Sequence, residues 1–149
     1  MSELAEIGVK FLSSIADVSA LTKVMLKKPQ ADCPVVHHCG PGVCMREVRI
    51  SKGVMAIGHE QKHEHLNLML SGKVLLSLGD SVTELTAPAI FVAPPGRKMF
   101  FVLEDMVWMN IYATELTDVN EVEDYFLGKN EDWAEDYASR FQAEQFQNE

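Results

Sequence analysis

The sequence is poor in cysteine and has no long apolar run. Its 149 residues contain three cysteines, an odd count that argues against a framework of disulfides and for a reducing compartment. No segment approaches the roughly 20 apolar residues that span a bilayer. The N-terminus, with Glu3 and Glu6, lacks the basic and apolar regions of a signal peptide. These absences predict a cytoplasmic protein with no membrane partner.

Basic clusters are missing as well. The longest basic runs are the pairs Lys27-Lys28 and Arg97-Lys98, which predicts no nucleic-acid partner, because phosphate binding needs many Lys and Arg together. The net charge of −9 is uneven. From Thr117 onward there are ten acidic and two basic residues, a net of −8, whereas residues 1–116 carry a net of −1. The acidity therefore belongs to the C-terminal segment.

Familiar catalytic motifs are also missing. The sequence contains no G-x-S-x-G nucleophile motif, no P-loop and no dinucleotide fingerprint. Glu47, Glu84 and Glu104 could serve as acids or bases, but nothing in the sequence pairs them with another titratable group. The sequence alone therefore leaves open whether the chain is an enzyme.

The periodicity of the apolar residues divides the chain, which we expect to form one domain over residues 1–149, into three parts. The first part, residues 1–30, is predicted to be helical over residues 3–28 and to end near Pro29. Its apolar positions recur at steps of three and four, typical of an amphipathic helix: Leu4, Ile7, Phe11, Ile15, Val18, Leu21 and Met25. Gly8 and the pair Ser13-Ser14 weaken the middle, so two shorter helices are the alternative.

The second part, residues 34–116, is predicted to be mainly β. Short alternating segments are separated by turn residues such as Ser71-Gly72 and Glu104-Asp105. The predicted strands are Val43–Ile50, Val54–Ile57, His65–Leu70, Lys73–Leu78, Val82–Leu85, Ala89–Ala93, Lys98–Leu103 and Met106–Ala113. Eight short strands with tight turns suit a jelly roll or a related small barrel.

The third part, residues 117–149, returns to an acidic helical pattern. Asp118 and Glu121 form a weak capping-box pattern, and Gly128 marks a C-terminal stop. A second acidic helix is predicted from Glu131 to about Phe146.

One motif within the β part places possible metal ligands at fixed intervals: Gly53-x5-His59-x-Gln61-x3-His65-x6-Gly72. It resembles the first signature of cupin proteins, G-x5-H-x-H-x3(or 4)-E-x6-G, in which the last ligand can be His. The resemblance implies a cupin jelly-roll barrel with an N-terminal helix and acidic C-terminal helices. It also implies a divalent metal, such as Zn, Ni, Fe or Mn, on His59, Gln61 and His65.

Two departures from the cupin pattern predict that such a metal is weakly held. Gln61 replaces an imidazole with a neutral amide, and Met99 stands where the second cupin signature has a His. Divalent metals of this kind favour imidazole and carboxylate ligands. His63 could supply a third imidazole from the mouth of the pocket, although an exposed turn is the more ordinary place for it.

Longer stretches resemble a narrower group of cupin-like proteins. Among them are Gly42-Val-Cys-Met-Arg-Glu47, the segment from His65 to Gly72 and Leu103-Glu-Asp-Met-Val-Trp108. The group is common in tailed-phage genomes and has no assigned function, and its members carry a His where this chain has Tyr112. The resemblance implies a viral origin, which would place the protein in the host cytoplasm.

Alternation along the strands outlines a ligand pocket. The residues expected to line it are Asn67, Met69, Met99, Trp108, Asn110 and Tyr112. Two amides beside an aromatic wall suit a small ligand. The alternative is that these side chains simply fill a narrow barrel.

A second cluster of possible metal ligands precedes the barrel motif: Cys33, His37, His38, Cys39 and Cys44. Zinc sites usually bring ligands in closely spaced pairs, and this cluster has no second well-spaced pair. A zinc site is therefore the less favoured interpretation. A more moderate one is that His37 or His38 leans over the barrel mouth.

Two classes of function remain. The favoured one is a small-ligand-binding or accessory protein with a degenerate metal site, and the alternative is a metal-dependent isomerase, lyase or dioxygenase. The chain is also expected to form a homodimer through an apolar outer face of the barrel. We expect this face to consist of Leu66, Leu68, Leu70, Val74, Leu76, Leu78, Val107, Met109 and Ile111.

Overall fold

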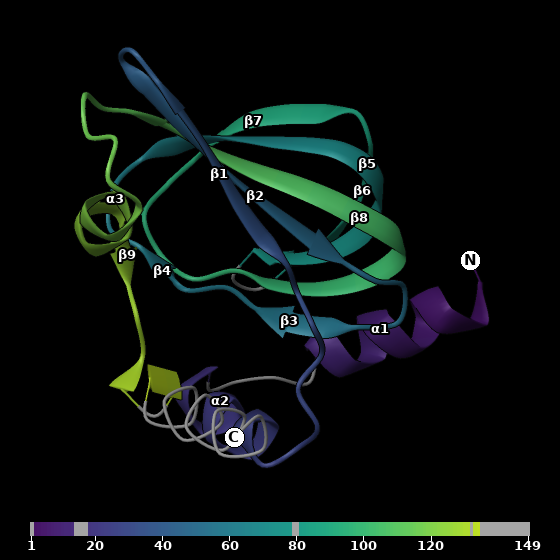
Figure 1. The fold of residues 1–149 in the computed structure, drawn as a ribbon. Coiled ribbons are helices and arrows are strands. Elements are labelled where there is room, and N and C mark those ends of the chain that lie inside the picture. Colours follow the sequence, from purple (N-terminus) through teal and green to yellow (C-terminus); the bar gives the residue numbers. More distant parts are fainter. Residues whose placement is uncertain (1, 14–17, 79–80, 132, 135–149) are drawn as a thin grey trace, which may run out of the picture.

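A computed structural model describes residues 2–13, 18–78, 81–131 and 133–134, and it is mainly β (Figure 1). The strands are β1 (Val35–Gly40), β2 (Val43–Ile50), β3 (Met55–Ile57), β4 (Glu60–Gln61), β5 (His65–Leu78), β6 (Ser81–Thr86), β7 (Ala89–Ala93), β8 (Met99–Ala113) and β9 (Leu127–Gly128). The helices are α1 (Glu3–Ser13), α2 (Val18–Leu26) and α3 (Val119–Phe126). The predicted mainly β fold is confirmed.

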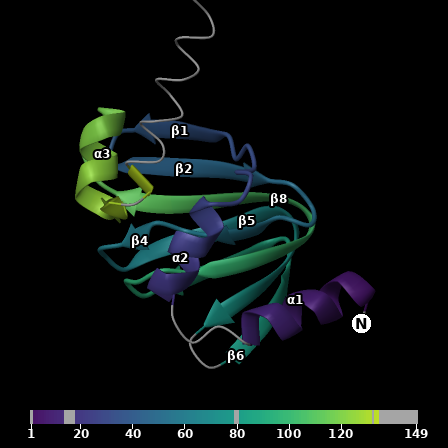
Figure 2. The ribbon, with the colours of Figure 1, turned by 90° about the horizontal axis from the view of Figure 1, so that it is seen from below.

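Two long strands hold the barrel together. The sheet order is β1-β2-β8-β5-β6, and β3 and β7 pair with β8 and β5 off this path. The first half of β5 pairs with β7 and its second half with β6, while β8 pairs first with β3 and later with β2. Because β5 and β8 each bend and change partners, the strands curl around a common interior (Figures 1 and 2).

The turns predicted at Ser71-Gly72 and Glu104-Asp105 are wrong, because β5 and β8 run through these positions without a break. The register between the two strands shifts between Met69 and Val74, as at a β-bulge. Gly72 has a φ of +99°, and a Cβ there would lie 2.5 Å from the backbone oxygen of Asp105. The strand can therefore bend at this position only with glycine.

The bulge moves side chains to the other face of β5. Before it, Met69 faces the interior, and after it Val74 and Leu76 do, so the expectation that these two point outward is wrong. The cluster inside the barrel consists of Ile50, Met69, Val74, Leu76, Phe100, Val102, Met106 and Trp108. All of them are less than a tenth exposed.

The N-terminal segment forms two helices, the alternative that the serines and Gly8 suggested. Helix α1 packs beside β6 against the outside of the sheet, where Leu75 and Phe101 are buried under Ala5 and Leu12 (Figure 2). Gly8 permits this contact, because a Cβ there would lie 2.6 Å from a ring atom of Phe101. None of the helices among the described residues is long and apolar enough to cross a membrane.

Helix α3 lies beside the ends of β1 and β2 and begins as predicted (Figure 2). The Asp118 side chain accepts a hydrogen bond of 3.0 Å from the backbone N–H of Glu121. After the helix, Leu127 and Gly128 pair with β4. Most of the second acidic helix predicted for the C-terminus lies outside the described residues.

Two of the three cysteines are not free thiols. Cys39 and Cys44 face each other across β1 and β2 and form a disulfide, whereas Cys33 is free. This pairing corrects the expectation of reduced cysteines. It also removes two sulfurs from the zinc cluster considered above.

Candidate functional site

The residues of the barrel motif gather at one end of the barrel. His59 follows β3, Gln61 lies in β4 and His65 begins β5. The backbone of Gln61 exchanges two hydrogen bonds of 2.9 Å with Gly96. This exchange ties the motif to the loop that leads into β8.

The Gln61 side chain is bound within the protein. It is 7% exposed, and its Oε1 accepts a hydrogen bond of 2.8 Å from the hydroxyl of Tyr112. The Tyr112 ring stacks on Phe126 of α3 at 4.1 Å. Burial raises the pKa of Tyr112 to about 12. A neutral phenol thus holds the amide oxygen that a metal would need.

His59 packs edge-on against the ring of Trp133, with 4.5 Å between ring centroids. Burial, together with the positive charge of Arg46, lowers the pKa of His59 to about 4. The imidazole is therefore neutral near pH 7.

His65 is 6% exposed, and its Nδ1 lies 2.9 Å from the backbone oxygen of His63. A carbonyl oxygen only accepts, so Nδ1 carries the hydrogen and Nε2 of the neutral ring carries a lone pair. Burial lowers the pKa of His65. Its Nε2 is buried and has no hydrogen-bond partner within the described protein.

His63 lies outside this group. Its side chain is exposed and stacks on Tyr125 of α3 with ring centroids 4.7 Å apart. The structure therefore places it in the turn, on the surface of α3.

The expected pocket residues divide into a polar and an apolar set. Asn67 is fully buried, and its Oδ1 accepts a hydrogen bond of 2.8 Å from Nδ2 of Asn110. Met69 and Trp108 belong to the apolar interior. The expectation that Met99 lines the pocket is wrong. Side chains alternate along β8, so Phe100 faces the interior and its neighbour Met99 lies in the outer cluster under α1.

Lys98 lies near His65 but is not among the residues expected to line the pocket. It is 9% exposed, and burial lowers its pKa. Its charge also helps to lower the pKa of His65, so the two groups lie near each other. Among the described residues, no carboxylate is within ion-pair distance of its ammonium group. The alternation of Val102, Phe100 and Lys98 along the sequence is the pattern that could have placed Lys98 on the interior side.

A second group missed by the sequence lies where α3 covers the barrel mouth. Oε1 of Glu123 is 3.0 Å from Nε2 of His37 and 3.3 Å from Nε of Arg46, and its Oε2 is 3.3 Å from Nζ of Lys129. The Glu123 carboxylate and Nε2 of His37 are close enough for an ion pair, but they are not aligned for a hydrogen bond. Burial raises the pKa of Glu123, but the neighbouring Arg46 and Lys129 outweigh it and the pKa is lowered. The expectation that His37 lies near the mouth agrees with this contact.

These residues do not fit a divalent metal. The Gln61 oxygen is occupied by Tyr112, and His59 faces Trp133. No group of three or more His, Cys, Asp or Glu side chains in the described part of the chain is arranged to hold a metal ion. The positive charge of Lys98, which contributes to the lowered pKa of His65, also disfavours a cation there.

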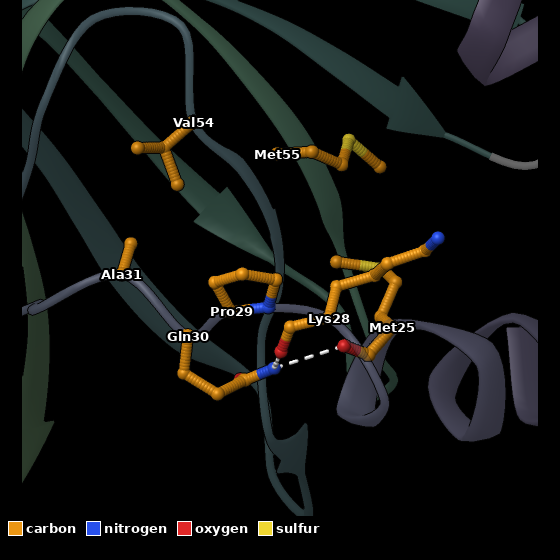
Figure 3. Close-up of a pocket in the computed structure, with 7 residues that line it drawn as sticks. All are labelled: Met25, Lys28, Pro29, Gln30, Ala31, Val54 and Met55. Atoms are coloured by element: carbon orange, nitrogen blue, oxygen red, sulfur yellow. Dashed lines mark hydrogen bonds between the residues drawn. The ribbon is translucent and has the colours of Figure 1, made fainter.

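A separate surface groove lies between the end of α2 and β3 (Figure 3). It encloses about 330 Å³ and is lined by Met25, Lys28, Pro29, Gln30, Ala31, Val54 and Met55. The Gln30 amide already donates to the backbone oxygens of Met25 and Lys28, at 2.9 Å each. Because the Gln30 amide is already hydrogen-bonded, Lys28 is the one charged side chain among the described residues that line the groove.

No family model matches the sequence, and no curated protein matches it. Solved structures with a similar fold include a cupin superfamily protein from Desulfitobacterium hafniense, with 12% identity over 58% of this chain and 81% of that chain and a TM-score of 0.47. An RmlC-like cupin from Methanocaldococcus jannaschii has 16% identity over 59% of this chain and 86% of its own, with a TM-score of 0.46. KdgF from Halomonas has 16% identity over 62% and 90%, with a TM-score of 0.44.

Proposed function

We propose that this protein binds a small ligand, as an accessory protein with a degenerate cupin metal site, and that it is not a metal-dependent enzyme. One observation carries the proposal: the imidazoles at the barrel end have cationic neighbours. Burial is the main cause of the lowered pKa of both His59 and His65. The charges of Arg46, Lys129 and Arg97 add to it at His59, where Glu123 opposes them, and the charge of Lys98 adds to it at His65.

The electrostatics disfavour a divalent cation at this place. A metal between His59 and His65 would be desolvated and would feel the repulsion of nearby positive charges, which grows as the local dielectric falls. Glu123 is the acidic group that opposes them at His59, and it is already paired with Arg46 and Lys129. A cation would therefore have to compete for a carboxylate that is in use.

Buried polar groups support a ligand-binding role. His65 and Asn67 each carry a buried polar atom without a partner in the described protein, and such atoms are costly to leave unpaired. The viral origin implied by the sequence resemblance belongs to the same proposal, since an accessory role suits a phage protein whose sequence contains no familiar catalytic motif.

Metal content of the purified protein tests the proposal. We expect well under one equivalent of Zn, Ni, Fe or Mn per chain, and no difference between the wild type and a His59→Ala variant. One equivalent in the wild type that is lost in His59→Ala would overturn the proposal and favour the metal-dependent isomerase, lyase or dioxygenase.

A Gln61→His variant tests the same point by gain of function. It frees Tyr112 and adds an imidazole, a ligand that cupin sites use. A change in the outer shell of a metal site commonly alters affinity by about 10- to 100-fold, and a direct ligand should matter at least as much. We expect Ni or Zn titration to show tighter binding to this variant than to the wild type.

A further inference from the structure

The surface groove between the end of α2 and β3 has mostly apolar walls (Figure 3). Met25 and Pro29 line it from α2 and the segment that follows, and Val54 and Met55 line it from β3 and the residue before it. Both methionines are partly exposed. Methionine side chains adapt to an apolar partner and make favourable sulfur contacts with aromatic rings. The groove therefore suits an aromatic side chain.

The surface beside the groove is positively charged. Residues 18–31 contain three lysines and no acidic residue, a net charge of +3: Lys23, Lys27 and Lys28. All three are exposed, and none forms an ion pair with a carboxylate in the part of the chain that the structure describes. Opposite charges across an interface steer a partner and fix its orientation. A partner for this groove should therefore carry carboxylates as well as an aromatic ring.

The C-terminal residues of the chain, which lie outside the described ranges, have this composition. Residues 135–149 contain four acidic side chains and one basic side chain, a net of −3. They also contain three aromatic residues: Tyr137, Phe141 and Phe146. Phe141 is the first wholly apolar ring after Ala134 along the chain. The segment is therefore complementary to the groove in charge and in side-chain type.

The end of the described chain is linked to α2 by a series of contacts. The ring of Trp133 packs edge-on against His59, with 4.5 Å between ring centroids. His59 follows Gly58, whose backbone oxygen accepts a hydrogen bond of 3.1 Å from Nε of Arg97. Nη1 of the same arginine donates a hydrogen bond of 3.3 Å to the hydroxyl of Thr22, in the middle of α2. The chain therefore leaves its described part close to α2.

The C-terminal segment is also long enough to reach the groove. The side chain of Asn130 accepts a hydrogen bond of 3.1 Å from the N–H of Trp133, and its backbone oxygen accepts one of 3.0 Å from that of Ala134, as at the start of a helix. In the helix that the sequence predicts from Glu131 to about Phe146, Phe141 would lie about 10 Å along the axis from Ala134. Helix α2, with nine residues, is about 14 Å long. Phe141 can therefore reach the end of α2.

We propose that residues 135–149 dock in the groove between α2 and β3, with Phe141 against Met25 and Met55 and the carboxylates of the segment near the α2 lysines. The covalent connection gives the segment an effective concentration on the order of millimolar, so a contact too weak to hold a free peptide is sufficient. The docked segment acts as a strap that keeps Trp133 on His59 at the barrel end. This inference is independent of the small ligand proposed for the barrel end.

NMR of the full-length chain with isotope-labelled methionine methyl groups tests the docking. A Phe141→Ala substitution removes the ring, so the methyl signals of Met25 and Met55 should shift more than those of the other methionines. Phe146→Ala is the matched control and should shift these two signals less. Unchanged Met25 and Met55 signals in Phe141→Ala, or an equal response to Phe146→Ala, would overturn the proposal.

A charge reversal on the α2 side provides a second test that leaves the C-terminal segment intact. Lys27 does not line the groove, and Lys27→Glu should weaken docking by about 5-fold, because a repulsion replaces an attraction near the acidic segment. The Met55 signal should then move toward its position in Phe141→Ala. Lys10→Glu, at an exposed position of α1, is the control and should leave that signal unchanged. A Met55 signal at its wild-type position in Lys27→Glu contradicts the docking beside the α2 lysines.

A mixing experiment identifies the chain that supplies the segment. Labelled Phe141→Ala protein is combined with an excess of unlabelled wild-type protein. Signals of Met25 and Met55 that stay at their Phe141→Ala positions support docking within one chain. Recovery of the wild-type positions would show that the segment of a second copy fills the groove, and the proposed docking within one chain would be wrong.

Discussion

Gly72 shows how one residue directs the fold. Its backbone has a φ of +99°, and a Cβ would lie 2.5 Å from the oxygen of Asp105 and 2.8 Å from Cα of Met106. Both atoms belong to the backbone of the neighbouring strand, so a side chain could not be accommodated by a rotamer change. Gly53 has a comparable φ of +85°, but a Cβ added there would meet no other heavy atom within 4 Å.

These two glycines therefore form a matched pair for mutation. Gly53→Ala should cost about 1 kcal/mol of unfolding free energy, because only the backbone strain is added. Gly72→Ala should cost about 3 kcal/mol or more, since the strands must also move apart. Urea denaturation of both variants measures the difference. Equal losses would mean that β5 and β8 can separate at the bulge at no cost.

The lowered pKa of His59 predicts that the folded protein loses stability in mild acid. Its pKa is about 4 in the folded protein and about 6.5 in an unfolded chain. As the pH falls below 6.5, the unfolded state takes up the proton first, so unfolding becomes more favourable until the pH reaches about 4. The full effect is about 3 kcal/mol. His37 and His65, whose pKa values are also lowered, act in the same direction.

A His59→Asn variant isolates this contribution. We expect the free energy of unfolding of the wild type to fall more steeply between pH 6.5 and 4 than that of the variant, by about 1–3 kcal/mol over the range. Denaturant titrations at several pH values measure both curves. Parallel curves would show that His59 is already solvated in the folded state.

At the scale of elements, α3 is attached to the barrel by a partly buried ion cluster. Glu123 is 12% exposed and contacts His37 and Arg46 of the β1–β2 hairpin. The helix also inserts Val122 and Phe126 against Tyr112. The charged contacts and the apolar contacts therefore hold the helix to the same end of the barrel.

A Glu123→Gln substitution should weaken the attachment of α3 to the barrel. The change leaves Arg46 without its carboxylate at 13% exposure, and we expect a loss of about 2 kcal/mol, between the values for surface and fully buried pairs. Hydrogen exchange of the α3 amides should accelerate more than that of β5. Glu121→Gln on the exposed side of the same helix is the control, with a loss of at most about 1 kcal/mol. Similar exchange rates in both variants would contradict a role for the cluster.

At the scale of the whole molecule, the structure moves the apolar outer face that the sequence predicted. Val74 and Leu76 turn inward after the bulge, and exposed residues of β7 take their place. Ile90 pairs with Leu68 and Val92 with Leu66 across β7 and β5. Ile90 is 70% exposed and Val92 59% exposed. We refer to Leu66, Leu68, Ile90, Val92 and Ile111 as the outer patch.

A homodimer through the outer patch remains our prediction. Helix α1 covers the other part of the sheet, over Leu75 and Phe101, and leaves the outer patch in solvent. Two copies of a neutral apolar face can meet about a two-fold axis without opposing like charges. Light scattering should give twice the 16.7 kDa mass of the chain at micromolar concentration.

Matched isoleucine variants test where the copies meet. Ile90→Asp buries a charge in the proposed interface and should weaken association by at least about 10-fold. Ile7→Asp alters an isoleucine that is 54% exposed on α1, outside the outer patch, and should leave the dimer intact. A monomeric wild type would contradict the prediction outright.

The sequence by itself determined part of the local structure. Strands β2 and β7 begin and end at the predicted residues, and the Asp118 cap starts α3 where expected. Alternation and caps depend on neighbours close in the chain, so they can be read without the fold. The turns expected at Ser71-Gly72 and Glu104-Asp105 could not, because both positions lie inside long strands. The intervals of the barrel motif likewise brought His59, Gln61 and His65 to one end of the barrel.

Only the tertiary structure decided how those residues are used. The hydrogen bond from Tyr112 to Gln61 spans 51 positions of sequence, and the contact of Arg46 with Glu123 spans 77. The bulge at Gly72 changed which side chains point inward, because its shape depends on the backbone of β8. The burial of Lys98, which is 9% exposed, likewise depends on the folded barrel. Such contacts depend on strand pairing and closure, which no spacing along the chain encodes.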